Sequence, residues 1–375
     1  MLFSKIRFDP LFLCGVLWVA LLISGCGKEI PALSGSTAQN LSTGPTPQPT
    51  PCSYSGKVLV ATGAGLNITD SSFSNFAQTV TTTNGLPHNE VRHLGVHQGV
   101  LMAATPQGLV VFKNDCSLTV EKVVTTAEGL PSNDVKRIVN APDGSLWVAT
   151  GGGVGRSTDG GNQFQTLISA TTPGLSSMSF STAGANYGSR FLFANNYSSN
   201  PVVHIVFSNG LCRSTDAGAN FTCIAPSTIT GSGNSNTVTG IVRLSSGRIV
   251  VSTGNRLIRS DDEGATWALV TDAIGHNWCN GLSRNPTTDS LFVSTAGWSS
   301  YSSSGQATSF SNYGAGSGGA WATIPLSNGQ ILIATVDSSK GLFVAQGEAT
   351  LTTTVAYTTA NGLLSNRVFD AIYLE

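Results

Sequence analysis

Residues 144–150 read GSLWVAT: a turn, alternating aliphatic residues, a small residue and a threonine. The pattern recurs as GKVLVAT ending at Thr62, GVLMAAT at Thr105, GRIVVST at Thr253, DSLFVST at Thr295 and GQILIAT at Thr335, with a degraded copy, SRFLFAN, at Asn195. Alternation with period two is typical of β-strands. Copies spaced about 45 residues apart match the length of a four-stranded propeller blade. The repeat therefore predicts an all-β, seven-bladed β-propeller over residues 52–375.

A second pattern precedes the expected innermost strand of three blades. It reads TTNGLPHNEV (82–91), TAEGLPSNDV (126–135) and TANGLLSNRV (359–368). The third copy is close to the C-terminus, so outer strands are missing after it, whereas residues 57–80 begin with outer strands and lack an inner strand. We therefore predict that the two ends of the chain complete one blade, which closes the ring and removes exposed sheet edges.

Turn chemistry accounts for these GLP segments. The glycine supplies the turn, the proline stiffens the entry to the next strand, and the asparagine can cap backbone groups. The residues concerned are Gly85, Gly129, Pro87, Pro131, Asn89, Asn133 and Asn366.

The composition fits a β-protein and excludes several other classes. Only 10% of the residues are charged, 43 of 375 are glycine, and the mean hydropathy is +0.11. A disordered chain needs lower hydropathy or higher net charge, and a helix bundle needs more Ala, Glu, Lys, Leu and Arg. The net charge of −1 provides no field that attracts nucleic acid, so we expect no nucleic-acid partner.

The N-terminus predicts export. Lys5 and Arg7 precede an apolar run (11–23) that is too short to span a bilayer and ends in Ser24-Gly25-Cys26. This resembles the bacterial lipoprotein signal, which implies removal of residues 1–25, acylation of Cys26 and an outer-membrane lipoprotein that faces the periplasm or the cell surface. An ordinary signal peptide cut elsewhere is the alternative. Residues 26–51, rich in Ser, Thr, Gly and Pro, predict a disordered tether.

Five cysteines remain after Cys14 and Cys26, and an exported protein can form disulfides. Cys212 and Cys223 flank a turn symmetrically, so they should lie opposite each other in a hairpin and form a disulfide. Cys52 and Cys116 should lie on one face of the ring, which predicts a second disulfide. Cys279 would then be unpaired, as an odd count requires of one cysteine.

Three turns in the middle of the chain share a further signature. They read RSTDGGNQF (156–164), RSTDAGANF (213–221) and RSDDEGATW (259–267). The aspartate can accept hydrogen bonds from turn amides two residues on, the glycine can take a positive φ, and the aromatic residue can pack between blades. We therefore assign structural roles to Ser157, Asp159, Gly161, Phe164, Ser214, Asp216, Gly218, Phe221, Ser260, Asp262, Gly264 and Trp267.

These signatures resemble two groups of propellers. The GLPxNxV…GxLWVAT pattern resembles two-component-regulator propeller repeats, which occur in periplasmic sensor domains. The RSxDxGxxF turns resemble the Asp-box, or BNR repeat, of sialidases, sortilin-type receptors and photosystem II assembly-factor-like propellers. Together the resemblances cover nearly all of residues 52–375 and imply the fold, but a propeller fold alone assigns no function.

The Asp-box makes a sialidase-like glycoside hydrolase the enzymatic alternative. Sialidases use an arginine triad, a tyrosine with a glutamate, and an acidic residue. Their Arg-Ile-Pro motif is missing from this sequence, and Arg156, Arg213 and Arg259 belong to the Asp-boxes. No nucleophile motif, phosphate loop or carboxylate pair stands out, so we predict no catalytic residue and no cofactor. A ligand-sensing subunit that acts through a partner sensor is a further alternative.

Histidines are densest at His88, His93 and His97. A metal site would need further convergent ligands, and no cysteine or carboxylate cluster is near them in the sequence. We therefore interpret them as solvated or turn histidines and predict no metal.

The sequence favours a monomeric, non-enzymatic binding or scaffold propeller that recognises an envelope protein or a glycan. Enlarged loops at 195–204 and 297–314, together with residues 276–278, should lie in one sector of one face. Exposed aromatic rings among hydroxyls and amides suit sugars or peptide surfaces; loops that only pack over the ring are the alternative. The candidate ligand-binding residues are Asn195, Tyr197, His276, Asn277, Trp278, Trp298 and Tyr301.

Overall fold

The computed structural model describes residues 56–76, 78–115, 117–141, 143–178, 190–194, 202–207, 209–231, 237–270, 278–296, 299–302, 310–313, 319–335, 339–351 and 354–374. The chain divides into two units, Met1–Gln48 and Pro49–Glu375, and every described residue belongs to the second. The predicted signal segment, Cys26, the tether, Cys52 and Cys116 lie outside the described residues, so the lipidation and the Cys52–Cys116 disulfide stay predictions.

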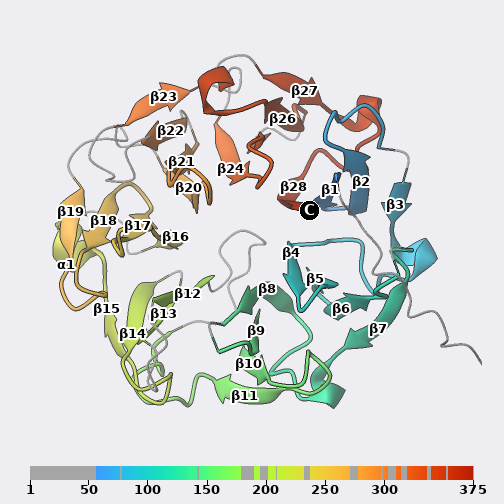
Figure 1. The fold of residues 1–375 in the computed structure, drawn as a ribbon. Helices are drawn as coiled ribbons and strands as arrows, with labels where there is room; N and C mark the ends of the chain where they lie inside the picture. The colour runs from blue at the N-terminus through green and yellow to red at the C-terminus, as the bar shows by residue number, and fades with distance from the viewer. Residues whose placement is uncertain are drawn as a thin grey trace, which may run out of the picture. The chain divides into compact units, whose positions relative to one another are not determined.

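The described strands form seven four-stranded antiparallel sheets around a common centre (Figure 1). From the innermost strand outward, the first sheet contains β28 (Val368–Leu374), β1 (Lys57–Thr62), β2 (Gly65–Asp70) and β3 (Gln78–Val80). The second contains β4 (His93–His97), β5 (Val100–Thr105), β6 (Gly108–Phe112) and β7 (Val120–Val124). The third contains β8 (Val135–Asn140), β9 (Leu146–Thr150), β10 (Gly153–Ser157) and β11 (Gln165–Ile168).

The fourth sheet contains β12 (Arg190–Ala194), β13 (Val202–Phe207), β14 (Gly210–Ser214) and β15 (Thr222–Ile224). The fifth contains β16 (Val238–Arg243), β17 (Ile249–Thr253), β18 (Leu257–Ser260) and β19 (Ala268–Val270). The sixth contains β20 (Cys279–Arg284), β21 (Leu291–Thr295), β22 (Ser299–Ser302) and β23 (Ser311–Tyr313). The seventh contains β24 (Ala320–Pro325), β25 (Ile331–Thr335), β26 (Leu342–Ala345) and β27 (Val355–Tyr357). The predicted all-β propeller of four-stranded blades is confirmed.

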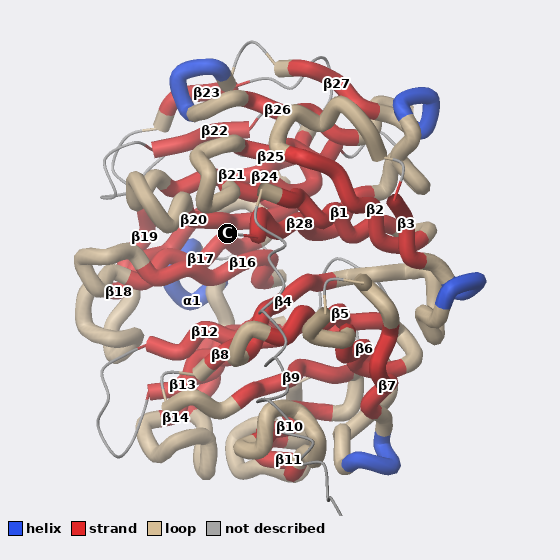
Figure 2. Tube along the Cα trace, turned by 45° about the vertical axis from the view of Figure 1, so that its right-hand side comes forward, coloured by secondary structure: helices blue, strands red, loops and turns tan. Residues whose placement is uncertain are grey.

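Within the described residues, helices are single turns between strands, as Figure 2 shows. They are α1 (Ser227–Thr230) and the 3-10 turns Thr82–Asn84, Thr126–Glu128, Glu348–Thr350 and Thr359–Asn361. Among the residues that the structure describes, no helix has the length and apolar character needed to span a membrane.

The first sheet joins the two ends of the described chain. β28 pairs with β1 in the register Lys57↔Leu374 to Ala61↔Asp370, so the C-terminal strand supplies the inner strand that the N-terminal hairpin lacks. This is the closure predicted from the third GLP segment.

The repeat threonine ends the second strand and holds the turn that follows it. Thr62, Thr105 and Thr150 each donate their hydroxyl hydrogen to the carbonyl oxygen of the glycine three residues on, at 2.8, 2.8 and 2.9 Å. The strands that these residues end are almost wholly buried, since a radial sheet has a neighbour on each face. The repeat is therefore explained by burial on two faces and a tight turn.

The SRFLFAN segment is not a second strand, contrary to the prediction. Residues 190–194 form β12, the innermost strand of the fourth sheet, and β13 occupies the second position. Phe207 of β13 pairs with Gly210 as Thr150 pairs with Gly153. Alternating hydrophobic residues occur on both strands, so alternation alone could not distinguish them.

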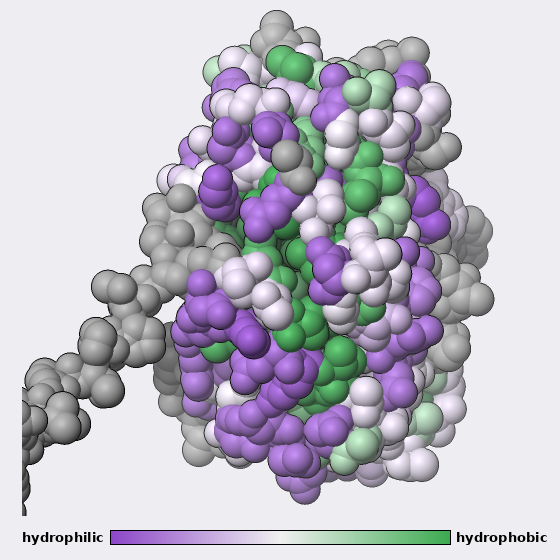
Figure 3. Space-filling model, turned by 90° about the vertical axis from the view of Figure 1, so that its right-hand side faces the viewer, coloured by the Kyte–Doolittle hydropathy of each residue, from purple (hydrophilic) through white to green (hydrophobic). Residues whose placement is uncertain are grey.

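Apolar side chains fill the spaces between neighbouring sheets. One cluster, for example, joins Met102 and Leu109 of the second sheet to Leu146 and Val148 of the third. Figure 3 views the side that carries β3 and β7 and shows a band of hydrophobic residues between hydrophilic ones. The apolar layers between sheets thus extend toward the rim of the ring.

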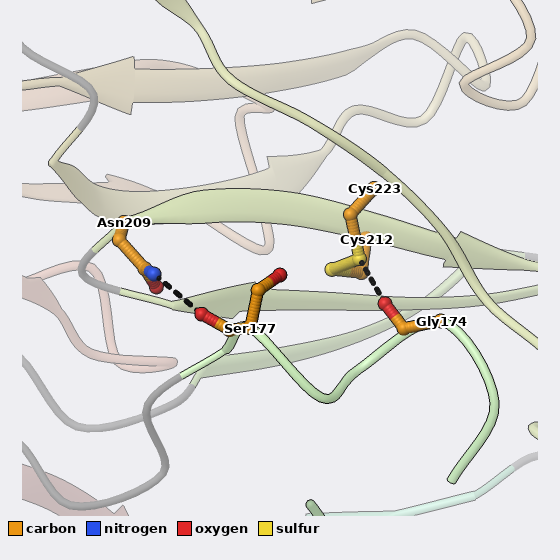
Figure 4. The surroundings of a disulfide bond; sticks show 5 residues. All are labelled: Gly174, Ser177, Asn209, Cys212 and Cys223. Atoms are coloured by element: carbon orange, nitrogen blue, oxygen red, sulfur yellow. Dashed lines mark hydrogen bonds between the residues drawn. A yellow bond between two sulfur atoms is a disulfide. The ribbon is translucent and has the colours of Figure 1, made fainter.

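The structure contains the predicted Cys212–Cys223 disulfide. The two residues pair directly across β14 and β15, and Cys223 Sγ lies 3.3 Å from the carbonyl oxygen of Gly174. Asn209 donates to the carbonyl oxygen of Ser177 at 2.9 Å, and this hydrogen bond attaches the hairpin to the segment 174–177 (Figure 4). Cys279, in contrast, is buried in β20, and this burial raises the pKa of its thiol to about 12.

Candidate functional site

The three RSxDxGxxF turns have hydrogen bonds that define their shape. In the first turn, Ser157 Oγ accepts from the Gly161 amide at 2.9 Å, and Asp159 Oδ1 accepts from the Gln163 amide at 3.1 Å. Asp216 and Asp262 likewise accept from amides four residues on, at 2.9 and 2.8 Å. The predicted span of two residues is therefore wrong, because the serine hydroxyl already takes the nearer amide.

These aspartates lie in solvent-facing turns rather than in a site. Hydrogen bonds from Asn220 and Ser214 lower the pKa of Asp216 to about 2, and bonds from Thr266 and Ser260 do the same for Asp262. The glycines Gly161, Gly218 and Gly264 have φ values of +88, +93 and +79°. The serine and the aspartate of the signature thus serve the turn itself.

The aromatic residues of these turns lie between sheets. Phe164 packs with residues of the second and third sheets, Phe221 packs with residues of the third and fourth, and Trp267 lies against a cluster from the fourth and fifth. The predicted interblade role agrees with these contacts.

Most of the predicted loop site lies outside the described residues, so the site stays a prediction. In each antiparallel sheet, the turn between the second and third strands and the connection to the next sheet lie at one end of the ring, here called the GLP end; the other two turns lie at the opposite end, here called the Asp-box end. Ala194 and Val202, which flank the Asn195–Tyr197 region, pair at the Asp-box end. Trp278 directly precedes β20 at the GLP end, whereas the described residues Ala194 and Val202 lie at the Asp-box end.

The remaining residues of the predicted ligand-binding site are either part of strands, exposed, or outside the described residues. Residues 297–314 include β22 and β23, so they are not one loop, and Tyr301 pairs within β22 with Phe292 and Ser311. Trp278 is 41% exposed. The positions outside the described residues are Asn195, Tyr197, His276, Asn277 and Trp298.

Charged residues gather instead at the GLP end of three neighbouring inner strands, β28, β4 and β8. Asp370, His93 and Arg137 pair with Ala61, Ala104 and Ala149, each of which precedes a repeat threonine. They therefore occupy the same level of the ring on successive sheets. We call the group formed by these three residues with Glu90, Arg92, Asp134 and Lys136 the channel cluster.

Two residues of the channel cluster reach the next inner strand. Asp370 Oδ2 accepts from the Leu94 amide at 2.9 Å and lies 3.6 Å from His93 Nε2. His93 Nδ1 accepts from the Ile138 amide at 3.4 Å, so a neutral His93 carries its proton on Nε2, facing Asp370. The imidazole thus links three sheets.

Four further residues form an ion-pair network beside this link. Arg92 Nε lies 2.7 Å from Glu90 Oε1, Arg92 also pairs with Asp134 of the next sheet, and Lys136 Nζ lies 2.8 Å from Asp134 Oδ2. Burial raises the pKa of Asp134, but hydrogen bonds from Lys136 and Arg92 outweigh it and hold the pKa below its usual value. Both cations of this network are thereby neutralised.

Replacing Arg92 should destabilise the ring. Its side chain is 12% exposed, and Arg92→Gln leaves Glu90 without its cation and Asp134 with Lys136 alone. We expect a loss of about 2 kcal/mol in the free energy of unfolding, below the range for a fully isolated buried charge. Urea denaturation of the full chain measures it. Arg156→Gln, which removes an exposed pair with Asp143, should cost less than about 1 kcal/mol; equal losses would contradict the interblade role of Arg92.

Arg137 differs from the other cations of the channel cluster. It is half-buried on the innermost strand, and neither a hydrogen bond nor an ion pair engages its guanidinium in the part of the chain that the structure describes. Burial lowers the pKa of Arg137, and Asp370 opposes that shift. Arginine stays protonated in proteins, so Arg137 is a charged donor with unused hydrogen-bonding capacity.

The same level of the ring differs between its two halves. In β12, Arg190 pairs with Val206, the residue before Phe207, so Arg190 holds the backbone position equivalent to Arg137. In β16, β20 and β24 that position is held by Gly240, Gly281 and Ala322. At this position of the innermost strand, four successive sheets therefore carry a titratable residue, and the other three sheets carry glycine or alanine.

The histidines are explained in part. His88 Nδ1 accepts from the Glu90 amide at 2.9 Å, as a turn histidine does. His93 and His97 lie in β4, and His97 is buried with Nδ1 2.8 Å from Asn140 Oδ1, so the prediction of solvated or turn histidines is wrong for these two. The described residues contain no group of three His, Cys, Asp or Glu side chains that could hold a metal.

The comparisons with known proteins agree on the fold. The sequence model of the family described as "Two component regulator propeller" matches residues 129–152, which run from within the second GLP segment through the GSLWVAT strand. No curated protein matches the sequence.

Solved structures extend this likeness at low identity. A functionally unknown protein from Desulfotomaculum acetoxidans is 16% identical, with a TM-score of 0.56 over 84% of this chain and 98% of that one. YCF48 from Cyanidioschyzon merolae is 14% identical, with a TM-score of 0.53 over 75% and 88%. An ancestral GH74 enzyme is 12% identical, with a TM-score of 0.51 over 68% of this chain, which spans only 36% of that enzyme. These similarities show a shared propeller fold.

Proposed function

We propose that this chain is a non-enzymatic binding propeller that recognises its ligand at the GLP end of the ring, over the channel cluster. The observation that carries this proposal is Arg137, a half-buried arginine on the innermost strand that forms neither an ion pair nor a hydrogen bond within the described structure. An unsatisfied charge in a partly desolvated position costs free energy. Binding sites, unlike structural ion-pair networks, keep such groups for a ligand.

The cluster also has the composition of a recognition site. Its ion pairs hold Arg92 and Lys136 in place, and backbone amides of neighbouring sheets hold Asp370 and His93. A site whose side chains are already fixed loses little conformational entropy on binding. The GLP end is therefore preorganised, whereas the polar groups of the Asp-box turns are used within the turns.

Glycoside hydrolysis of the sialidase type receives no specific support from the described residues. Arg156, Arg213 and Arg259 lie in the third strands β10, β14 and β18, away from the innermost strands. Arg156 pairs with Asp143, and Arg213 donates to the carbonyl oxygen of Glu263 at 2.7 Å. Arg156 and Arg213 are thus engaged by protein groups of the turns and of the neighbouring sheet.

We further propose that the propeller works at the bacterial envelope, attached through Cys26 and the 26–51 tether. The support for this is the signal-like N-terminal sequence ending in Ser24-Gly25-Cys26. The ligand is then an envelope protein or glycan, and sensing through a partner would use the same face.

Photo-crosslinking at the two ends of the ring tests the proposal. Gln107 is exposed in the β5–β6 turn at the GLP end, and Gln163 is exposed in the β10–β11 turn at the Asp-box end. Benzoylphenylalanine at position 107 of the full chain in its native membrane should give a discrete adduct, and the same residue at position 163 should give none. Adducts at 163 alone would place recognition at the other end.

A further inference from the structure

We propose that Arg137 binds the carboxylate of a small anionic ligand at the centre of the ring. This inference rests on the proposed function and specifies the chemistry of the ligand. It begins from the charges of the channel cluster: three cations, Arg92, Lys136 and Arg137, and three carboxylates, Glu90, Asp134 and Asp370.

The six charges are not paired evenly. Glu90 and Asp134 lie within ion-pair distance of Arg92, and Lys136 also contacts Asp134. Asp370 directs one carboxylate oxygen to the Leu94 amide and lies 3.6 Å from His93 Nε2, and it attracts Arg137 without forming an ion pair with it in the described structure. Arg137 therefore retains a full positive charge and its fork of N–H donors, which fits a carboxylate in bidentate geometry.

The position of Arg137 favours a small group over a flat surface. The equivalent residues of the two preceding sheets, His93 and Asp370, reach the next inner strand and bond its amide. A guanidinium cannot accept from an amide, so Arg137 cannot make that contact with β12. Because Arg137 is half-buried, a single charged group that enters between the inner strands can reach it, and a broad surface cannot.

The surrounding charges favour a monoanion. Asp370, Asp134 and Glu90 stand in the same cluster, and each additional negative charge on a ligand would be repelled by them. A carboxylate carries one charge, whereas sulfate carries two. A sugar acid and an acidic peptide side chain both present this group, so the shared chemistry is the carboxylate.

The test is calorimetric titration of the full chain, solubilised from membranes in detergent. The probes are galacturonate, its neutral counterpart galactose, acetyl-Glu-amide, whose single charge is its side-chain carboxylate, and inorganic sulfate. We expect at least one carboxylate probe to bind, and Arg137→Gln to weaken it by roughly tenfold or more. Tighter binding of galacturonate would identify a sugar acid as the source of the carboxylate, and tighter binding of acetyl-Glu-amide would identify a peptide side chain.

Matched variants separate this role from a structural one. Arg156→Gln removes the same charge from a third strand and should leave probe binding unchanged, while Arg137→Lys should give an intermediate affinity because it keeps the charge and loses the fork. Arg137→Gln should lower the melting temperature little, since Arg137 loses no ion pair or hydrogen bond within the described residues and only the longer-range attraction of Asp370. Equal binding by wild type and Arg137→Gln, no binding of either carboxylate, or equally tight sulfate binding would overturn the inference. None of these results would affect a crosslink at position 107, which tests the proposed function separately.

Discussion

Gly129→Ala should destabilise the protein by about 3 kcal/mol or more, because two costs add at one position. Gly129 ends the 3-10 turn of the second GLP segment with φ +92°, and a Cβ there would lie 2.0 Å from the carbonyl oxygen of Phe164. The adjacent Phe164 amide donates to the carbonyl oxygen of Glu128 at 2.7 Å, so the backbone cannot move away without losing this bond. Urea denaturation of the full chain measures the difference.

Gly144→Ala is the matched control for this prediction. Gly144 lies in the β8–β9 turn of the same sheet with φ +80°, and a Cβ there would meet no atom within 4 Å. Gly144→Ala should lower the free energy of unfolding by only about 1 kcal/mol, the cost of placing a residue with a Cβ at a positive φ. Similar losses for the two variants would show that the contact between the GLP turn and Phe164 is not tight.

Stability should also fall by about 3 kcal/mol between pH 6.5 and pH 4 because of His204. The imidazole is completely buried in β13, and neither ring nitrogen has a hydrogen-bond partner in the described structure. Burial, reinforced by Arg213 and Arg243 and opposed by the Glu263 carbonyl, lowers the pKa of His204 to about 4. The neighbouring Trp267 ring, 6.4 Å away edge to face, adds no charge.

The direction of this effect follows from proton uptake. The folded-state pKa lies below the unfolded value of 6.5, so the unfolded chain binds the extra proton in this window. The contribution is intact above pH 6.5, declines as the pH falls, and is fully lost near pH 4. The exposed Asp216 and Asp262, with pKa values of about 2, lose their contributions only below pH 3.8, the ordinary aspartate value.

His204→Leu removes the titrating group without adding a polar one. Its unfolding free energy should change little between pH 6.5 and 4, and wild type should show the full decline in the same denaturant series. A decline of the same size in His204→Leu would assign the pH dependence to other groups and contradict the prediction.

Much of the fold could be predicted because each blade repeats the same local physics. In most blades the second strand is buried on two faces and ends in a threonine, which in several of them donates to the glycine carbonyl of the following turn. Because these blades need the same residues at the same places, the pattern is visible in the sequence. The symmetric spacing of Cys212 and Cys223 works in the same way, because it depends only on hairpin register. The prediction is wrong for the fourth sheet because its second strand ends in Phe207 instead of threonine, and because hydrophobic residues alternate in both β12 and β13.

The candidate site could not be predicted, since it depends on how repeats differ. Aligned on the GLPxNxV segments, His93, Arg137 and Asp370 occupy one position, the second residue after the valine. Repeat comparison emphasises identical residues, and these three share no residue type. Only 10% of the residues in this chain are charged, so a repeat position that holds histidine, arginine and aspartate in three copies is itself an indication of a site. That these three residues are neighbours, however, follows only from the pairing of β28 with β1.

Crosslinking from Gln107 and Gln163, in wild type and in Arg137→Gln, tests the central claim most directly. If the GLP end is the binding face and Arg137 engages the ligand, position 107 yields an adduct in wild type, a weaker one in Arg137→Gln, and position 163 yields none in either. Equal adducts at both positions, unchanged by Arg137→Gln, would contradict recognition over the channel cluster.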